Sequence, residues 1–334
     1  MLLFSVLDLC PIVQGSDAAQ AFRNSADLAR HAEEWGYHRF WLAEHHNISG
    51  IGSAATSVVI GHVAGATTRI RVGAGGIMLP NHAPLVIAEH FGTLESLYPG
   101  RIDLGLGRAP GSDQLTARAL RRNLGSSGDT FPEDVLELQS YFRGAEPGQH
   151  LRAVPGAGLT VPLYLLGSSD FSARLAAELG LPFAFASHFA PEYLHVALAL
   201  YRKTFRPSAE LERPYVIVGM GIYAAETDAE GRRIFTSAQL STLNLIRGHP
   251  GQLPPPIESM DGRWSPVEQA AISDRTHYTA VGSAATVRRR FQEVLEETHA
   301  DEIILTAQIF EHAARLRSFE IAAKILAEIR TAQS

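Results

Sequence analysis

The sequence predicts an α/β protein that forms a (β/α)8 TIM barrel with a long insertion between its seventh and eighth strands. Two observations favour this fold: strand-like apolar runs alternate with amphipathic stretches, and eight such strands can be counted in 334 residues. The competing fold, an open doubly wound sheet, would be expected to carry a G-x-G-x-x-G loop after its first strand, but Asp8-Leu9-Cys10-Pro11 has no such pattern. We therefore treat residues 1–334 as one barrel domain.

The predicted strands are short and mostly apolar, as expected of parallel strands covered on both faces. They are Leu2–Leu9, Arg39–Leu42, Ile70–Leu79, Ile102–Leu106, Leu163–Leu166, Phe183–Ala186, Tyr215–Tyr223 and Glu302–Ala307. The predicted helices carry apolar residues at helical spacing and are Ala18–Trp35, Pro84–Tyr98, Pro132–Phe142, Ser172–Leu179, Pro191–Phe205 and Ala284–Thr298. For the first helix, we expect Ser16 or Asp17 to cap the N-terminus and Gly36 to end it.

The segment from Arg247 to His277 interrupts this alternation. It contains four prolines between residues 250 and 256 and has little apolar periodicity before Val267. A loop of this length in a compact domain is usually functional or mobile. Because it follows the seventh strand, we expect residues 247–277 to lie over the catalytic face as a mobile active-site loop.

The composition excludes several classes of function. Apolar residues make up 46% of the chain and charged residues 19%, which predicts a large core, and the net charge of −6 gives no basic excess for nucleic acid. Cys10 is the sole cysteine, so an internal disulfide and a cysteine-based metal cluster are excluded. No apolar run approaches membrane-spanning length, and the first residues lack the basic start of a signal peptide. We expect a cytoplasmic protein that does not bind membranes.

Three ionisable residues, Glu44, His45 and His46, follow the second strand directly. Adjacent side chains on an extended chain point in opposite directions, so one imidazole is expected to face the pocket as a general acid or base. A metal site would need more ligands. The other histidines considered, none of which forms an H-x-H or H-x-x-x-H pair, are His62, His82, His90 and His188. The sequence therefore predicts no metal site.

Two glycines, Gly75 and Gly76, interrupt the third strand. Glycine inside a strand indicates either a bulge or a tight bend at the barrel rim, or a place where a flat ligand lies against bare backbone. The sequence leaves both interpretations open.

Candidate anion-binding residues follow the fourth and fifth strands. Arg108 ends the fourth strand, and Arg118 follows ten residues later. The fifth strand ends in Gly167-Ser168-Ser169-Asp170-Phe171-Ser172, where a helix begins. Ordinary N-capping by Ser169 or Asp170 is the commoner interpretation. The alternative is that Arg108 and the backbone N–H groups of this helix hold one phosphate.

Taken in order, these strand ends resemble the bacterial luciferase-like flavin monooxygenase superfamily, and specifically its single-chain, alkanal-monooxygenase-like branch. The resemblance covers nearly the whole chain. The matching motifs are Ser5-Val6-Leu7-Asp8-Leu9, Trp41-Leu42-Ala43-Glu44-His45-His46-Asn47, Gly75-Gly76-Ile77-Met78-Leu79-Pro80-Asn81-His82-Ala83-Pro84, Gly100-Arg101-Ile102-Asp103-Leu104-Gly105-Leu106-Gly107-Arg108, and Val281-Gly282-Ser283 before the last helix.

The resemblance implies an FMNH2-dependent monooxygenase of a two-component system. Reduced FMN, supplied by a separate NAD(P)H:flavin reductase, would react with oxygen to a flavin C4a-hydroperoxide that oxygenates a small-molecule substrate. We also expect a homodimer. The implied site consists of His45 as the catalytic acid/base, Gly75 and Gly76 joined by a non-prolyl cis peptide under the isoalloxazine, Arg108, Arg118, Ser169 and Ser172 at the FMN phosphate, and Ser168 beside the ring or ribityl chain.

The chain departs from the light-emitting members of this superfamily. They carry a cysteine where this chain has Gly107, a glutamate where it has Ser168, and a longer segment between the two arginines. Light emission from aldehydes is therefore not expected. Two alternative functions remain: a deazaflavin-dependent oxidoreductase on the same barrel, and a non-catalytic flavin-binding protein.

Overall fold

A computed structural model describes residues 2–109, 114–120, 130–144 and 148–332. Eight parallel strands close into a barrel, because each pairs with the next and the last pairs with the first. These strands are β1 (Leu3–Asp8), β2 (Arg39–Leu42), β3 (Arg71–Met78), β4 (Ile102–Gly107), β5 (Leu163–Gly167), β6 (Phe183–Phe185), β7 (Val216–Ala224) and β9 (Glu302–Thr306). The predicted barrel is thus confirmed.

A ninth strand, β8 (Thr279–Gly282), was not predicted. It pairs with Gly221–Ala224 at the end of β7, just beyond the part of β7 that pairs with β9. Only two of its four residues are buried, which is too short a pattern to stand out in the sequence. The chain between β7 and β9 therefore holds more structure than a single loop.

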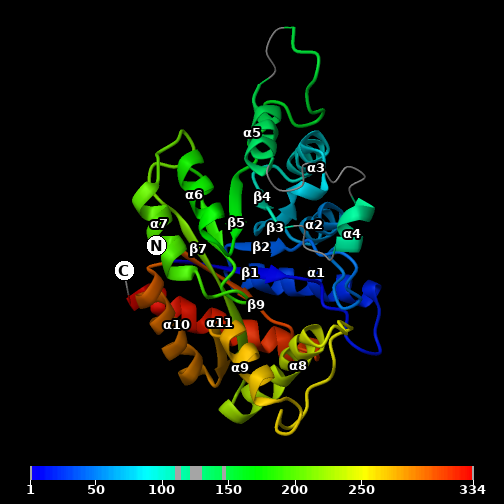
Figure 1. The fold of residues 1–334 in the computed structure, drawn as a ribbon, viewed down its shortest axis with the longest axis vertical. Helices are drawn as coiled ribbons and strands as arrows, with labels where there is room; N and C mark the ends of the chain where they lie inside the picture. The colour runs from blue at the N-terminus through cyan, green and yellow to red at the C-terminus, as the bar shows by residue number, and fades with distance from the viewer. Residues whose placement is uncertain (1, 110–113, 121–129, 145–147, 333–334) are drawn as a thin grey trace.

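Helices surround the barrel, as Figure 1 shows, with α5 at one end of the long axis and α8 and α9 at the other. They are α1 (Ala18–Glu34), α2 (Thr56–Gly65), α3 (Pro84–Leu97), α4 (Gln114–Leu120), α5 (Phe131–Phe142), α6 (Asp170–Leu179), α7 (Leu194–Thr204), α8 (Asp228–Ile246), α9 (Pro266–Arg275), α10 (Ala284–Thr298) and α11 (His312–Ala332), with the 3-10 turn η1 (Leu79–Asn81). Asp17 caps α1 by accepting from the Gln20 N–H at 2.8 Å.

Five of these helices, α2, α4, α8, α9 and α11, were not predicted, and the motif at Val281-Gly282-Ser283 precedes α10 and not the last helix. In α8 the reason is visible in its buried face. That face contains only two large apolar residues, Ile234 and Leu243, among Gly231, Thr236, Ser237 and Ala238, so the helix lacks a clear apolar period.

The N-terminal ends of the strands are closed by a buried network of charges. Arg39 at the start of β2 lies 2.9 Å from Glu302 at the start of β9 and 2.8 Å from Asp103 in β4. The same guanidinium donates to the Tyr164 hydroxyl at 2.7 Å. These contacts tie β2, β4, β5 and β9 together across the barrel floor, and removing one partner would leave a buried charge unpaired.

The segment 247–277 is packed and partly helical. Its helix α9 begins with a capping box between Ser265 and Glu268, and Arg247 pairs with Glu268 at 2.7 Å. Leu253 is buried and forms a β-bridge with Val13. Among the residues of α9 only Ile272 is buried, which explains the missing periodicity. The predicted active-site loop thus contains a helix that the sequence did not predict, and its mobility stays a prediction.

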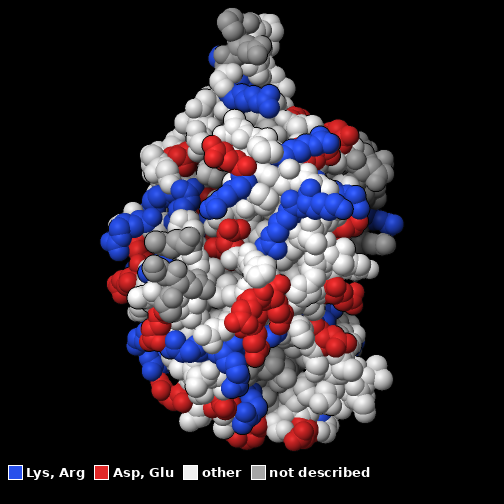
Figure 2. All heavy atoms as spheres, turned by 90° about the vertical axis from the view of Figure 1, so that its left-hand side faces the viewer, with Lys and Arg blue, Asp and Glu red and all other residues white. Residues whose placement is uncertain are grey.

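Charged side chains of both signs are spread over the face in Figure 2. The absence of nucleic-acid binding stays a prediction. Within the described ranges, no helix is both long and apolar enough to cross a membrane.

Candidate active site

A cavity of about 500 Å³ lies at the C-terminal ends of the strands. Every barrel strand or its following loop contributes to its wall, together with α8 and the segment 247–277. Seven of the eight site residues predicted from sequence line it: His45, Gly75, Gly76, Arg108, Ser168, Ser169 and Ser172. The eighth, Arg118, is exposed on α4 and is not among the lining residues.

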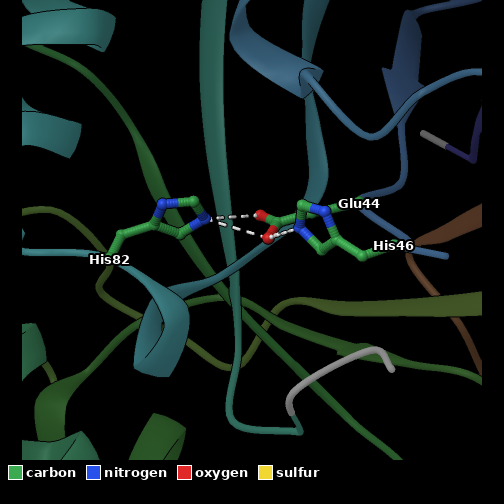
Figure 3. Close-up of side chains that lie close together, drawn as sticks. All are labelled: Glu44, His46 and His82. Carbon is green, nitrogen blue, oxygen red and sulfur yellow. Dashed lines mark hydrogen bonds and ion pairs between the residues drawn. The ribbon is translucent and has the colours of Figure 1, made fainter. Parts of the chain in front are cut away.

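The two adjacent histidines after β2 have different surroundings. His45 lines the cavity. His46 instead lies with its Nε2 2.7 Å from Glu44 Oε1, and His82 Nε2 lies 2.9 Å from the same oxygen (Figure 3). The Met78 N–H donates to Glu44 Oε2 at 2.9 Å. His45 is therefore the imidazole in position for chemistry in the cavity, while His46 belongs to a hydrogen-bonded cluster.

Glu44 is the centre of that cluster. Burial alone would raise the pKa of its carboxyl, but hydrogen bonds from His82, His46 and the backbone of Met78 together hold the pKa below its ordinary value. The carboxylate is therefore ionised near neutral pH and accepts from both imidazoles. Its backbone N–H also donates to the Gly76 carbonyl at 3.2 Å. Glu44 thus holds the end of β2 against the end of β3.

Glu44, His46 and His82 are also close enough to share a metal ion, since their donor atoms lie within 4.8 Å of one another. Hydrogen bonding alone accounts for this arrangement, because the carboxylate already accepts from both rings and from Met78. The sequence analysis missed the cluster because His82 reaches it only through β3 and η1. The absence of a metal site stays a prediction.

The peptide bond between Gly75 and Gly76 is cis, as the resemblance implies. The register of β3 against β4 shifts between Gly75 and Ile77, which agrees with the first of the two interpretations, a bulge or bend in the strand. A Cβ on Gly75 would lie 2.8 Å from Leu7 Cδ1, and one on Gly76 would lie 2.5 Å from the Gly105 carbonyl oxygen. Barrel packing therefore requires both glycines, while their backbone also lines the cavity. Contact with a flat ligand stays a prediction.

Arg108 offers a cation at the end of β4. Its guanidinium lies 4.1 Å from the centroid of the Phe171 ring, and the residue is exposed. No carboxylate among the described residues forms an ion pair with it. A guanidinium that is held by an aromatic face, and that pairs with no carboxylate in the described ranges, is well placed to bind an anion.

The start of α6 supplies the other candidate residues for binding an anion. Ser169 is the N-cap residue, yet its side chain makes no capping hydrogen bond. Asp170 pairs with Arg174 at 3.6 Å. The Ser172 side chain is buried, and a Cβ on Gly167 would lie 2.3 Å from its Oγ. Simple N-capping by the Ser169 side chain is therefore not what is observed, and the first-turn N–H groups remain available to a phosphate.

The sequence analysis did not include His188 among the site residues. It follows β6 and lines the cavity, just as His45 follows β2. Burial, with a smaller contribution from the nearby His45, lowers the pKa of His188 to about 4. The rule that polar residues at strand ends form the pocket would have identified it, but we considered it only as a metal ligand.

Comparison with known proteins agrees with this geometry. The family model of the luciferase-like monooxygenases matches residues 3–319. A luciferase-like monooxygenase of Escherichia coli K12 is 57% identical over 326 residues, covering 98% of this chain and 97% of that protein. An N-acetyl-S-alkylcysteine monooxygenase of Bacillus subtilis is 37% identical and covers 72% of each chain. The crystal structure of apo-MsnO8 superposes with a TM-score of 0.88 at 32% identity, covering 98% of this chain and 99% of that one.

Two more distant structures share the fold alone. One is the oxygenating constituent of a diketocamphane monooxygenase in complex with FMN, at 17% identity and a TM-score of 0.71, covering 97% of each chain. The other is an F420-dependent secondary alcohol dehydrogenase, at 14% identity and a TM-score of 0.67, covering 95% of this chain and 97% of that one. FMN and F420 are thus both cofactors of this fold. With the family model spanning nearly the whole chain, the protein belongs to the luciferase-like monooxygenase family.

Proposed function

We propose that the protein is an FMNH2-dependent monooxygenase of a two-component system, which oxygenates a small organic substrate. The observation that carries this proposal is that one cavity brings together an imidazole, a bare backbone wall and an anion-binding cluster. Those three features suit, in turn, proton transfer, contact with a flat ring and binding of a phosphate. The 37% identical relative named as a monooxygenase adds support for oxygenation.

The residues present fit FMN. The phosphate would be held by Arg108, Ser169, Ser172 and the N-terminus of α6, because they combine a cation with hydroxyls and N–H groups, and no carboxylate of the described residues pairs with that cation. The bare backbone at Gly75 and Gly76 would lie against the isoalloxazine, with Ser168 near the ring or ribityl chain. Bound reduced FMN would supply the electrons that activate oxygen. Arg118 is exposed, so a contact between it and the phosphate stays a prediction.

His45 would move the proton that oxygenation requires, because imidazole can donate and accept near neutral pH. The apolar walls around it, which include Leu7, Trp41 and Phe185, would exclude water from the reacting atoms. Glu44 would act through position, since its side chain and backbone hold β3 beside His45.

The second candidate function is a deazaflavin-dependent oxidoreductase, which would move hydride without oxygen. This second function is favoured by one observation, the shared fold of the F420-dependent dehydrogenase. The third, a non-catalytic flavin-binding protein, leaves His45 in the cavity without a use.

The experiment that tests the proposal measures the affinity of the protein for FMN, FMNH2 and reduced F420 under anaerobic conditions. We expect FMNH2 to bind tightest and to support oxygen-dependent product formation once a flavin reductase and NAD(P)H are added. Tight binding of F420 with oxygen-independent turnover would favour the second function. FMN binding with no turnover of any substrate in a screen would favour the third.

We also propose a homodimer that joins through α2 and α3. These helices expose large apolar side chains, with Val58 70%, Val86 41% and Leu97 63% exposed. Such a face is unusual on a monomer when its residues are contiguous. Light scattering should give twice the mass of the chain, and Val58→Glu with Leu97→Glu should give the monomer mass.

A further inference from the structure

The turn after β6 is built to hold one imidazole in the cavity wall. The Ser187 hydroxyl is buried and donates to the Gly219 carbonyl of β7 at 2.7 Å. This bond fixes the turn against β7 and sets the next residue, His188, beside the cavity. The His188 ring is half-buried and meets the Phe189 ring edge-on, with their centroids 4.8 Å apart. The position of His188 is therefore defined by its neighbours.

The protein leaves a nitrogen of this ring without a partner. His188 Nδ1 is buried and has no hydrogen bond to any residue that the structure describes. A Cβ on Gly219 would lie 2.4 Å from Nδ1, so only glycine at that position leaves room for the ring. Buried polar groups in folded proteins are nearly always hydrogen-bonded, and an exception calls for an explanation. A structural histidine would not need a glycine opposite it and an unmade bond.

The charge state of the ring suits hydrogen bonding and not ion pairing. Because its pKa is lowered to about 4, His188 is neutral near pH 7. A neutral imidazole offers one donor and one acceptor, so it can bind either a carbonyl or a hydroxyl group. A half-turn about the Cβ–Cγ bond moves Nδ1 away from Gly219 and leaves the outline of the ring nearly unchanged.

The surroundings of His188 indicate the substrate and not the flavin as its partner. The residues proposed to hold the flavin lie in β3 and at or after the ends of β4 and β5, whereas His188 follows β6. The cavity wall contains Phe185 and Phe189 on either side of this turn, and α8 with the segment after it adds Phe235, Leu245 and Leu253 beside the smaller polar residues Ser241 and Thr242. A molecule that fills this part of the cavity would therefore be largely apolar. A polar group on it could form a hydrogen bond with His188.

We propose that His188 is a substrate-binding residue, whose ring hydrogen-bonds the carbonyl or hydroxyl group of an otherwise apolar substrate. The proposal rests on the proposed function, because it assigns the substrate class for that same cavity. It makes His188 a determinant of specificity and leaves proton transfer to His45.

Three probes with the same carbon chain test this assignment: 2-heptanone, 2-heptanol and heptane. Their affinities are measured by ligand-observed NMR on the wild-type protein, on His188→Leu and on His150→Leu, which removes an exposed imidazole outside the cavity lining. We expect His188→Leu to weaken the ketone and the alcohol about ten-fold, as for one hydrogen bond, and to leave heptane unchanged. His150→Leu should behave as wild type.

A second measurement does not depend on the variant. In wild-type protein labelled with 15N-histidine, 2-heptanone should shift the ring nitrogen resonances of His188. The proposal is overturned if those resonances stay fixed at saturating ketone, if no probe binds, or if His188→Leu weakens all three probes equally. It is also overturned if His188→Leu lowers the affinity for FMN while 2-heptanone still binds more tightly than heptane, because the ring then binds the flavin. Probe binding needs neither flavin nor oxygen, so a failure of the monooxygenase proposal is observed separately.

Discussion

The two ends of the barrel differ in the polar groups that they leave without a protein partner. At the N-terminal ends of the strands, Arg39, Asp103 and Glu302 are buried and paired with one another. At the C-terminal ends, His188 Nδ1 has no partner among the described residues, and the Ser169 hydroxyl caps no helix. Paired charges hold a structure together, whereas unpaired polar groups are available to ligands. The difference identifies the C-terminal end as the functional one, as in other (β/α)8 barrels.

The largest effect on activity is expected at His45, the proposed proton-transfer residue at the C-terminal end of the barrel. His45→Ala should lower product formation about 10²–10⁴-fold, since a general acid–base group contributes that much, and should change FMN affinity little. Steady-state turnover and flavin titration measure the two quantities. His46→Ala is the matched control and should reduce turnover less, because His46 pairs with Glu44. A greater loss of turnover in His46→Ala than in His45→Ala would show that His46, and not His45, transfers the proton.

At the opposite end, Arg39→Met should destabilise the fold without disturbing the site. Removing the guanidinium leaves the buried Glu302 without its cation, while Asp103 keeps its pair with Arg71 at 2.6 Å, and an unpaired buried charge costs about 3–5 kcal/mol. Urea denaturation measures the free energy of unfolding. Folded Arg39→Met should bind FMN like wild type. A loss below about 1 kcal/mol would show that this network contributes little to stability.

The pH dependence of stability distinguishes the two ends further. The folded-state pKa of His188 is about 4, below its ordinary value of 6.5, so between these values the unfolded chain binds a proton that the folded chain does not. Stability therefore falls as pH falls from 6.5 towards 4, by roughly 2–3 kcal/mol from this residue. His188→Leu should lack that part of the fall in urea titrations at several pH values. Parallel profiles for the two proteins would contradict the buried, neutral ring.

A smaller effect is expected at the phosphate cluster. Arg108→Ala should weaken FMN about ten- to a hundred-fold and riboflavin hardly at all, because only FMN carries the phosphate and a charge-assisted hydrogen bond contributes about 1.5–3 kcal/mol. Arg118→Ala tests the second arginine in the same fluorescence titration. Since Arg118 does not line the cavity, a loss at Arg108 alone would restrict the cluster to the end of β4 and the start of α6. Equal losses for both flavins would give Arg108 a structural role.

The barrel could be predicted because its signal is local and repeated. Apolar strands alternate with helices, and site residues could be chosen because they lie at or near the ends of those strands. Seven of the eight predicted site residues line one cavity. What could not be predicted depends on contacts distant in sequence. His82 reaches Glu44 across 38 positions, and α8 buries mostly small and polar residues that leave no clear apolar period. Arg118 was chosen through the resemblance, and it stands exposed on α4.

The most direct test of the central claim is a crystal structure of the protein with FMN. We expect the phosphate at Arg108, Ser169 and Ser172, and the isoalloxazine against the backbone of Gly75 and Gly76 within reach of His45. A flavin bound elsewhere, or a phosphate that contacts none of these three residues, would contradict it.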